Sequence, residues 1–231
     1  MKLAVMQPYL FPYIGYFQLI MSSDIFVIYD DVHFIKQGYI NRNNILAGGV
    51  IQRFTVPVQN GSSNSLIKDV VFQSNVRKVL AAIQQAYSKS LFIKDILPVI
   101  EDILNYEERS ISALCEYSYK RIFEYLGIEK QIVLSSDLDY DKSQAADKKL
   151  VSMCQLLGAK TYINSPGGRE LYSSEMFAPY GIELKFIKPA LEEYKQLNTD
   201  GFVKGLSIID VLMNNSIEET LDLLSKFTCE K

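Results

Sequence analysis

Residues 2–31 read KLAVMQPYLFPYIGYFQLIMSSDIFVIYDD, and this stretch decides the fold. Residues 2–7 are a short apolar run that ends before Pro8, which is typical of a buried strand. Residues 16–22 predict a short helix, and Gly15 lets its first turn approach a neighbouring element closely. Residues 24–29 form a second apolar run, as in strands covered on both faces. The stretch therefore predicts a compact strand–helix–strand unit, with a crossover near the lower length limit.

The middle of the chain has a different pattern of polar and apolar residues. Residues 33–44 are polar and irregular, whereas 51–58 and 66–72 predict two strands joined by NGSSNS in a hairpin-like connection. Apolar residues then recur with a helical period, and they predict three helices at 75–87, 92–106 and 111–126. We interpret residues 74–127 as a helical insertion.

The last hundred residues alternate strands and helices at the spacing of a parallel sheet. Strands are expected at 132–134, 161–164 and 182–187, and helices at 145–157, 207–213 and 217–227. The sequence thus predicts an α/β fold with a mostly parallel, Rossmann-like sheet and helices on both faces. We expect residues 1–231 to form a single domain.

Composition excludes several classes of protein. The chain has 231 residues, of which 48% are hydrophobic, and a net charge of -3, which is an ordinary globular balance. A general nucleic-acid-binding protein would show a basic excess. Three scattered cysteines and one histidine offer no zinc-ligand spacing, so no metal site is expected.

The uncharged stretch at 6–20 raises the question of a membrane segment. It is shorter than the roughly 20 residues that span a bilayer, and Pro8 and Pro12 break a helix in its first half. The features of a signal peptide are also missing. We therefore expect a cytoplasmic protein with no membrane insertion.

Three segments follow predicted strands, and ligands of such sheets bind beyond the carboxyl ends of strands. The segments are PYLFPYIG at 8–15, DDVHFIK at 30–36 and SPGGR at 165–169. They share one rim if their strands are neighbours. The first segment is interpreted as a rigid ligand loop, although prolines that only turn the chain and tyrosines that only pack are an equal alternative.

These segments carry a resemblance to a known family. The stretches MQPYLFPYIGYFQLI, DIFVIYDDVHFIKQGYINRNNI, TVPV, LGAKTYINSPGG and LSIIDVLMN occur in order along nearly the whole chain and resemble the WbqC-like protein family. Members of that family are often encoded among genes for bacterial surface polysaccharides. One proposed role is the transfer of glycine to an amino sugar, and the resemblance implies that role here.

A weaker similarity links the first thirty residues to pantothenate synthetase and other nucleotidylyl transferases. Those enzymes have a His-x-Gly-His motif, and this chain has Tyr13-Ile14-Gly15-Tyr16 in its place. In that superfamily the histidines stabilise phosphates during attack on ATP. Tyrosine donates a hydrogen bond but carries no positive charge at neutral pH, so the fold can persist while the chemistry changes.

The candidate catalytic residues are His33 and Asp31. His33 is the only histidine, and an imidazole beside a carboxylate can act as a general base toward an attacking amine. The alternative is an exposed turn in which one aspartate caps a helix.

Candidate substrate-binding residues occupy the same three segments and the polar run after the second. Arg42 matches a phosphate or carboxylate in a bidentate manner, and the glycine pair could form an anion nest before a helix. The alternatives are solvated charges and a plain strand-to-helix turn. The full set is Gln7, Tyr9, Tyr13, Gly15, Tyr16, Asp30, Lys36, Asn41, Arg42, Asn43, Ser165, Gly167, Gly168 and Arg169.

Two function classes stay open. The first is an acyl or aminoacyl transferase that forms an amide on a nucleotide-linked amino sugar for O-antigen synthesis, with glycine as a candidate amino acid. The second is a nucleotidylyl transferase or a non-catalytic nucleotide-sugar-binding protein. ATP and an activated acyl donor are the candidate cosubstrates, and a homodimer is a candidate assembly. The sequence names neither the sugar nor the nucleotide.

Overall fold

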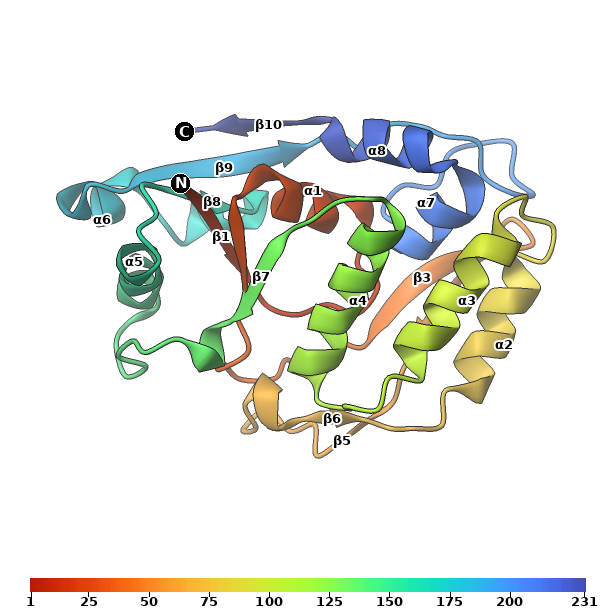
Figure 1. The fold of residues 1–231 in the computed structure, drawn as a ribbon, viewed down its shortest axis with the longest axis horizontal. Coiled ribbons are helices and arrows are strands. Elements are labelled where there is room, and N and C mark those ends of the chain that lie inside the picture. Colours follow the sequence, from red (N-terminus) through yellow and green to blue (C-terminus); the bar gives the residue numbers. More distant parts are fainter.

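The computed structural model describes residues 1–231 and is built around one six-stranded sheet (Figure 1). The strands lie in the order β10-β9-β8-β1-β2-β7, and every pair is parallel except β9 with β10. The predicted α/β fold with a mostly parallel sheet is therefore confirmed. The bounds are β1 (Lys2–Met6), β2 (Ile25–Ile28), β7 (Gln131–Leu134), β8 (Thr161–Asn164), β9 (Glu183–Pro189) and β10 (Phe227–Glu230).

Helices cover both faces of this sheet, which is why its strands are apolar on both sides. On β1, Ala4 contributes to one core cluster, whereas Leu3 and Val5 contribute to the other. The first face packs against α1 (Ile14–Ser22), α4 (Ile111–Tyr125) and α8 (Ile217–Ser225). The second packs against α5 (Ala146–Leu156) and the short α6 (Ser174–Phe177) (Figure 1).

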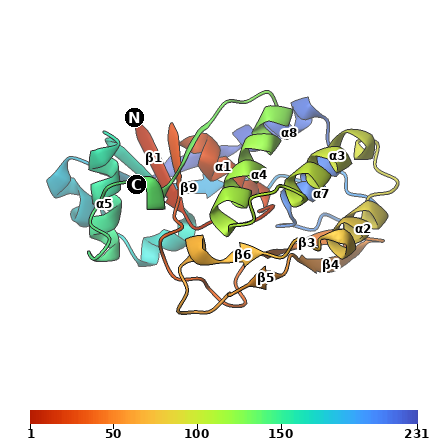
Figure 2. The same ribbon diagram turned by 60° about the horizontal axis from the view of Figure 1, so that its bottom comes forward.

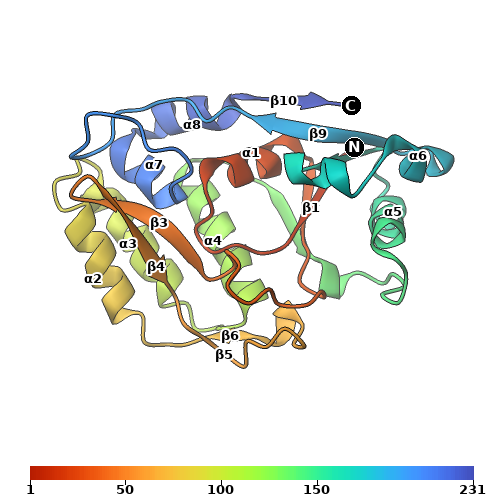
Figure 3. The same ribbon diagram turned by 180° about the vertical axis from the view of Figure 1, so that it is seen from behind.

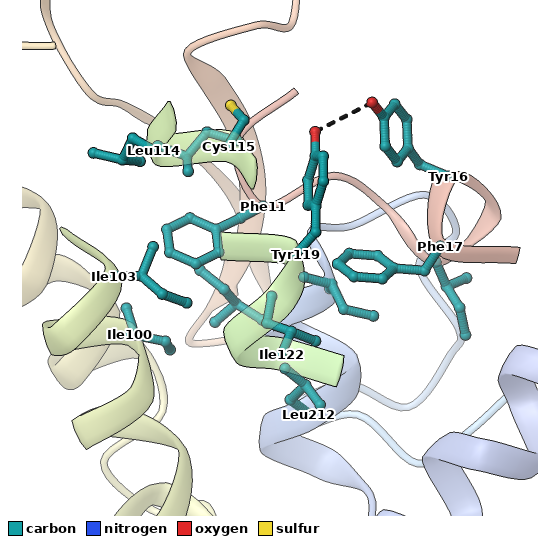
Figure 4. Close-up of a cluster of buried hydrophobic side chains, with 14 of the residues drawn as sticks. Phe11, Tyr16, Phe17, Ile100, Ile103, Leu114, Cys115, Tyr119, Ile122 and Leu212 are labelled. Atoms are coloured by element: carbon teal, nitrogen blue, oxygen red, sulfur yellow. Dashed lines mark hydrogen bonds between the residues drawn. The ribbon is translucent and has the colours of Figure 1, made fainter. Parts of the chain in front are cut away.

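The helices α2 (Arg77–Ala86), α3 (Ile93–Leu104) and α4 lie side by side at one end of the molecule (Figures 1 and 2). Their buried apolar residues belong to the same 44-residue core cluster as those of α1. Figure 4 shows Ile100, Ile103 and Ile122 from two of these helices grouped with Phe11 and Leu212. No helix combines the length and the hydropathy that crossing a membrane requires. The remaining α-helix is α7 (Ile208–Asn214).

Part of the stretch expected to be irregular is a strand. β3 (Arg42–Ala47) pairs antiparallel with β4 (Val50–Thr55) across Gly48 and Gly49, whose φ angles are +58° and +81°. Positive φ at both central residues is the geometry of a tight hairpin turn. Asn43 and Ile45 are buried, while Arg42 and Asn44 lie on the other face of β3. The polar composition of 41–44 therefore hid an amphipathic strand.

Two other expectations were wrong in part. The hairpin expected between 51–58 and 66–72 is reduced to β5 (Val58–Gln59) and β6 (Val71–Phe72), because all of Val50–Thr55 pairs with β3 instead. Figure 2 shows the β3–β4 sheet and the β5–β6 sheet together on one side of the molecule. The last helix ends at Ser225 rather than at 227, because β10 follows it as the antiparallel edge strand.

Candidate functional site

A cavity of about 400 Å³ opens at the carboxyl end of β1, on the side of β8. The chain places β2 and β7 on one side of β1, and then β8 and β9 on the other. The boundary between β1 and β8 is thus the point where the strand order reverses, and open α/β sheets bind ligands there. The lining residues are Met6, Gln7, Pro8, Tyr9, Tyr13, Gly15, Tyr16, Leu19, Ile35, Gly38, Tyr39, Ile40, Ser165, Pro166, Ile187 and Pro189.

The walls come from segments that are distant in the sequence. They are the loop from β1 into α1, the segment 35–40 after β2, and the start of the segment after β8. Because β8, β1 and β2 are neighbours, the three loops singled out from the sequence do share one rim. Ile187 and Pro189 of β9 close a further side.

Four half-buried polar side chains reach this cavity without a hydrogen-bonding partner in the protein. They are those of Gln7, Tyr9, Tyr13 and Ser165, all of which were predicted to bind substrate. Because their polar atoms are not used within the protein and lie at an open cavity, these four side chains are available to meet a ligand. Burial raises the pKa of the Tyr9 and Tyr13 hydroxyls, so both are neutral donors at neutral pH. No charged side chain lines the cavity.

Tyr16, also predicted as a ligand contact, is buried and holds the loop in place. Its hydroxyl donates to the Gln7 carbonyl oxygen at 2.8 Å. The Tyr119 hydroxyl accepts from the Tyr9 backbone N–H and donates to the Tyr9 carbonyl oxygen, both at 2.8 Å. It also lies 3.2 Å from the Tyr16 hydroxyl (Figure 4). Tyr119 belongs to α4, and sequence reasoning missed it because its only signal is a tyrosine at a buried helical position.

Phe11, in the same loop, has a φ of +49°, which bulky residues avoid. Its ring is fully buried, and its carbonyl oxygen accepts from Asn43 Nδ2 at 2.7 Å and from Ser207 Oγ at 2.8 Å. Strained backbone persists only where the surroundings hold it, and it is concentrated at ligand sites. Asn43, predicted to bind substrate, is buried and holds this loop. Figure 3 shows the red loop running between β1 and β3.

Gly15 lies in the first turn of α1 and allows a close contact. A Cβ atom on Gly15 would lie 2.3 Å from Tyr13 Cε2, so only glycine accepts the ring in this position. Both residues line the cavity. The glycine therefore shapes the cavity by determining where the Tyr13 ring lies.

The aspartate pair after β2 is tied to the segment after β7. Asp30 accepts from the Ser136 backbone N–H at 2.9 Å and from its hydroxyl at 2.8 Å. Asp31 accepts from the Tyr140 hydroxyl at 2.8 Å and lies 3.3 Å from Lys142 Nζ. Both carboxylates are buried and outside the cavity walls. They join the ends of β2 and β7.

His33 is exposed and makes no side-chain hydrogen bond to Asp31. It lies in the segment that continues into the cavity wall at Ile35, but it does not line the cavity itself. The structure therefore places the predicted catalytic pair on the rim, without bringing its two members together.

The cationic segment after His33 contributes to one wall indirectly. Arg42 Nε donates to the Gly38 carbonyl oxygen at 2.7 Å, and Gly38 lines the cavity. Asn41 Nδ2 donates to the Val56 carbonyl oxygen at 2.9 Å. Lys36 is exposed and outside the walls.

The segment after β8 forms a 3-10 helix at Pro166–Glu170 rather than the start of an α-helix. Neither Gly167 nor Gly168 has the positive φ of an anion nest. Gly168 is required for packing, because a Cβ there would lie 2.4 Å from Asn164 Nδ2. The exposed Arg169 covers the Phe186 ring at 4.6 Å, away from the cavity. Ser165 alone of the predicted residues in this segment reaches the cavity.

The structure shows no cluster of metal-binding side chains. No group of three or more His, Cys, Asp or Glu side chains is placed to hold a metal ion. What the cavity offers is aromatic surface with neutral hydrogen-bonding groups around it.

Comparison with known proteins identifies the family of this chain. The model of the WbqC-like protein family matches residues 7–221, which contain nearly all of the cavity-lining residues. This chain belongs to the WbqC-like protein family. A relative described as "Uncharacterized protein Rv1507c", from Mycobacterium tuberculosis (strain ATCC 25618 / H37Rv), is 30% identical over 222 residues. The alignment covers 94% of this chain and 95% of that protein. No solved structure matches.

Proposed function

We propose that this protein is an acyl or aminoacyl transferase that forms an amide on a nucleotide-linked amino sugar, for a bacterial surface polysaccharide such as O-antigen. The proposal takes its substrate class from the WbqC-like resemblance. The observation that carries it is the cavity, where four unpaired polar side chains surround aromatic and prolyl walls. Aromatic faces pack against sugar rings or bases, and the polar tips can orient hydroxyl and amide groups.

The reaction sets clear chemical demands. The sugar amine attacks the carbonyl carbon of an activated acyl donor, so a C–N bond forms and the bond to the leaving group breaks. A sugar amine or α-amine is largely protonated at neutral pH, so a base must take its proton. The protonated phenols of Tyr9 and Tyr13 suit the opposite role, donating to the carbonyl oxygen as negative charge develops there.

His33 is the proposed base. It lies in the segment that continues into the cavity wall. In this structure it is exposed and unpaired with Asp31. That observation favours a second candidate, a non-catalytic nucleotide-sugar-binding protein. The tyrosines at positions 13 and 16, in place of two phosphate-stabilising histidines, weigh against a nucleotidylyl transferase.

Ligand binding is the first test. The protein is screened by thermal shift against nucleotide-linked amino sugars, free amino acids and ATP, since a ligand that binds only the folded state raises the melting temperature. In Gly15→Ala the Tyr13 ring must move, and we expect about tenfold weaker binding of the responding sugar. The matched control is Gly167→Ala, whose new Cβ meets nothing within 4 Å. Equal affinity in the two variants would place the ligand elsewhere.

Catalysis is tested separately with His33→Ala. Loss of a general base costs about 100-fold or more in the rate of amide formation, whereas loss of an exposed bystander costs almost nothing. A variant that turns over like the parent removes His33 from the mechanism. Binding of the sugar without product from any activated donor would favour the non-catalytic candidate.

A further inference from the structure

The hairpin of β3 and β4 carries two arginines on one face. Arg42 pairs with Thr55 and Asn44 pairs with Arg53 across the hairpin, and directly paired residues share a face. The opposite face, with Asn43 and Phe54, is buried.

Neither arginine is neutralised within the protein. Arg42 uses only Nε, toward the Gly38 carbonyl oxygen, so its two Nη groups have no partner in the chain. The exposed Arg53 makes a single long contact, 3.4 Å from Nε to Asn44 Oδ1. Neither guanidinium forms a salt bridge. Arginines held near one another without a carboxylate are suited to bind an anion from outside.

This face lies beside the cavity. The Gly38 contacted by Arg42 is a wall residue. The Asn44 carbonyl oxygen accepts from the Ser207 backbone N–H, and Ser207 forms a backbone bridge with Tyr13, another wall residue. The positive charge of Arg53 also acts on the Tyr9 hydroxyl, where it opposes the rise in pKa that burial causes. Figure 3 shows β3 and β4 next to the loop that leaves β1.

We propose that Arg53, together with Arg42, binds the diphosphate of the ligand outside the cavity, while an uncharged ring of the same ligand occupies the cavity. The uncharged walls offer a phosphate no opposite charge, whereas the two arginines share the hairpin face on which Arg42 contacts the wall residue Gly38. This inference rests on the proposed function for the identity of the ligand, but the arginine pair can be tested without it.

The probe is inorganic pyrophosphate, the part that nucleoside-diphosphate sugars share, titrated calorimetrically into the protein at low salt. Arg53→Gln should weaken its binding about tenfold, the loss expected for one charge-assisted contact. Added salt should weaken binding to the parent, because the arginine is exposed. Arg77→Gln is the matched control, since Arg77 is also exposed, without a salt bridge, and remote from the cavity.

Each outcome decides one question. Pyrophosphate binding that falls in Arg53→Gln but not in Arg77→Gln supports the inference, even if no nucleotide sugar binds and the proposed function fails. Absence of pyrophosphate binding to the parent, or equal binding by the two variants, overturns it. If a nucleotide sugar binds the parent and Arg53→Gln equally, the proposed function stands and the arginine site is wrong.

Discussion

Removing the Tyr119 hydroxyl tests whether a helix remote in sequence holds the ligand loop. This one oxygen accepts from the Tyr9 N–H and donates to the Tyr9 carbonyl oxygen, each at 2.8 Å. In Tyr119→Phe both backbone groups lose their partner while the buried ring remains. A net contribution of about 1 kcal/mol per hydrogen bond gives a loss of about 2 kcal/mol in the free energy of unfolding.

The measurement is urea and thermal denaturation of the parent and the variant. For a chain of this size, a loss of about 2 kcal/mol lowers the melting temperature by roughly 4–8 °C. Tyr125→Phe is the matched control, because Tyr125 lies on the same helix and its hydroxyl makes no hydrogen bond in the protein. Ligand affinity should also fall in Tyr119→Phe, since the loop carries Tyr9 and Tyr13. If the two variants unfold alike, within roughly 0.5 kcal/mol, Tyr119 does not hold the loop.

Three further predictions concern the surroundings of the loop and the core. Asn43→Ala should lower the free energy of unfolding by about 0.5–1.5 kcal/mol in urea denaturation, because the Phe11 carbonyl oxygen loses one of its two donors and keeps Ser207 Oγ; an unchanged midpoint would contradict this. Gly49→Ala should destabilise more than Gly48→Ala in thermal melts, since only its Cβ would meet the Asn198 carbonyl oxygen, at 2.3 Å; equal losses would refute the contact. Burial raises the pKa of Asp210 above its ordinary 3.8, so the native state holds this proton more tightly than the unfolded state. The contribution of Asp210 to stability is therefore full below pH 3.8, and it is lost as pH rises through the higher folded pKa. Denaturation at several pH values should show that the Asp210→Asn variant lacks this decline. Parallel stability profiles of the parent and the variant would contradict the assignment.

Asp210 also shows how a short motif takes its meaning from distant residues. Its carboxylate accepts from the Tyr87 hydroxyl at 2.8 Å, the Tyr194 hydroxyl at 2.7 Å and Gln196 Nε2 at 2.9 Å. Tyr87 directly follows α2, and the other two donors belong to the segment before α7. The sequence showed an aspartate in an apolar helical stretch, and only the fold showed that three donors surround it.

The sequence by itself determined the elements whose signals are local. Apolar runs bounded by proline or acidic residues predicted β1 and β2, and helical periodicity predicted α2 to α4. The rule that ligands bind at the carboxyl ends of parallel strands led to the three loops around the cavity. Four residues selected in those loops reach the cavity with polar groups that have no partner in the protein. The predictions of strands and helices worked because backbone preference and the burial of one face act over a few neighbouring residues.

Tertiary structure alone decided which of those residues meet. β3 pairs with β4 rather than remaining irregular, because strand pairing and the burial of Ile45 and Phe54 outweigh a polar composition. Asp31, expected beside His33, is instead bound by Tyr140 from a segment more than a hundred residues away. Tyr119 holds the cavity loop from a helix with no local sign of that role. Such contacts depend on how distant segments pack, because a hydrogen bond between two residues stabilises the protein only after folding has brought both residues together.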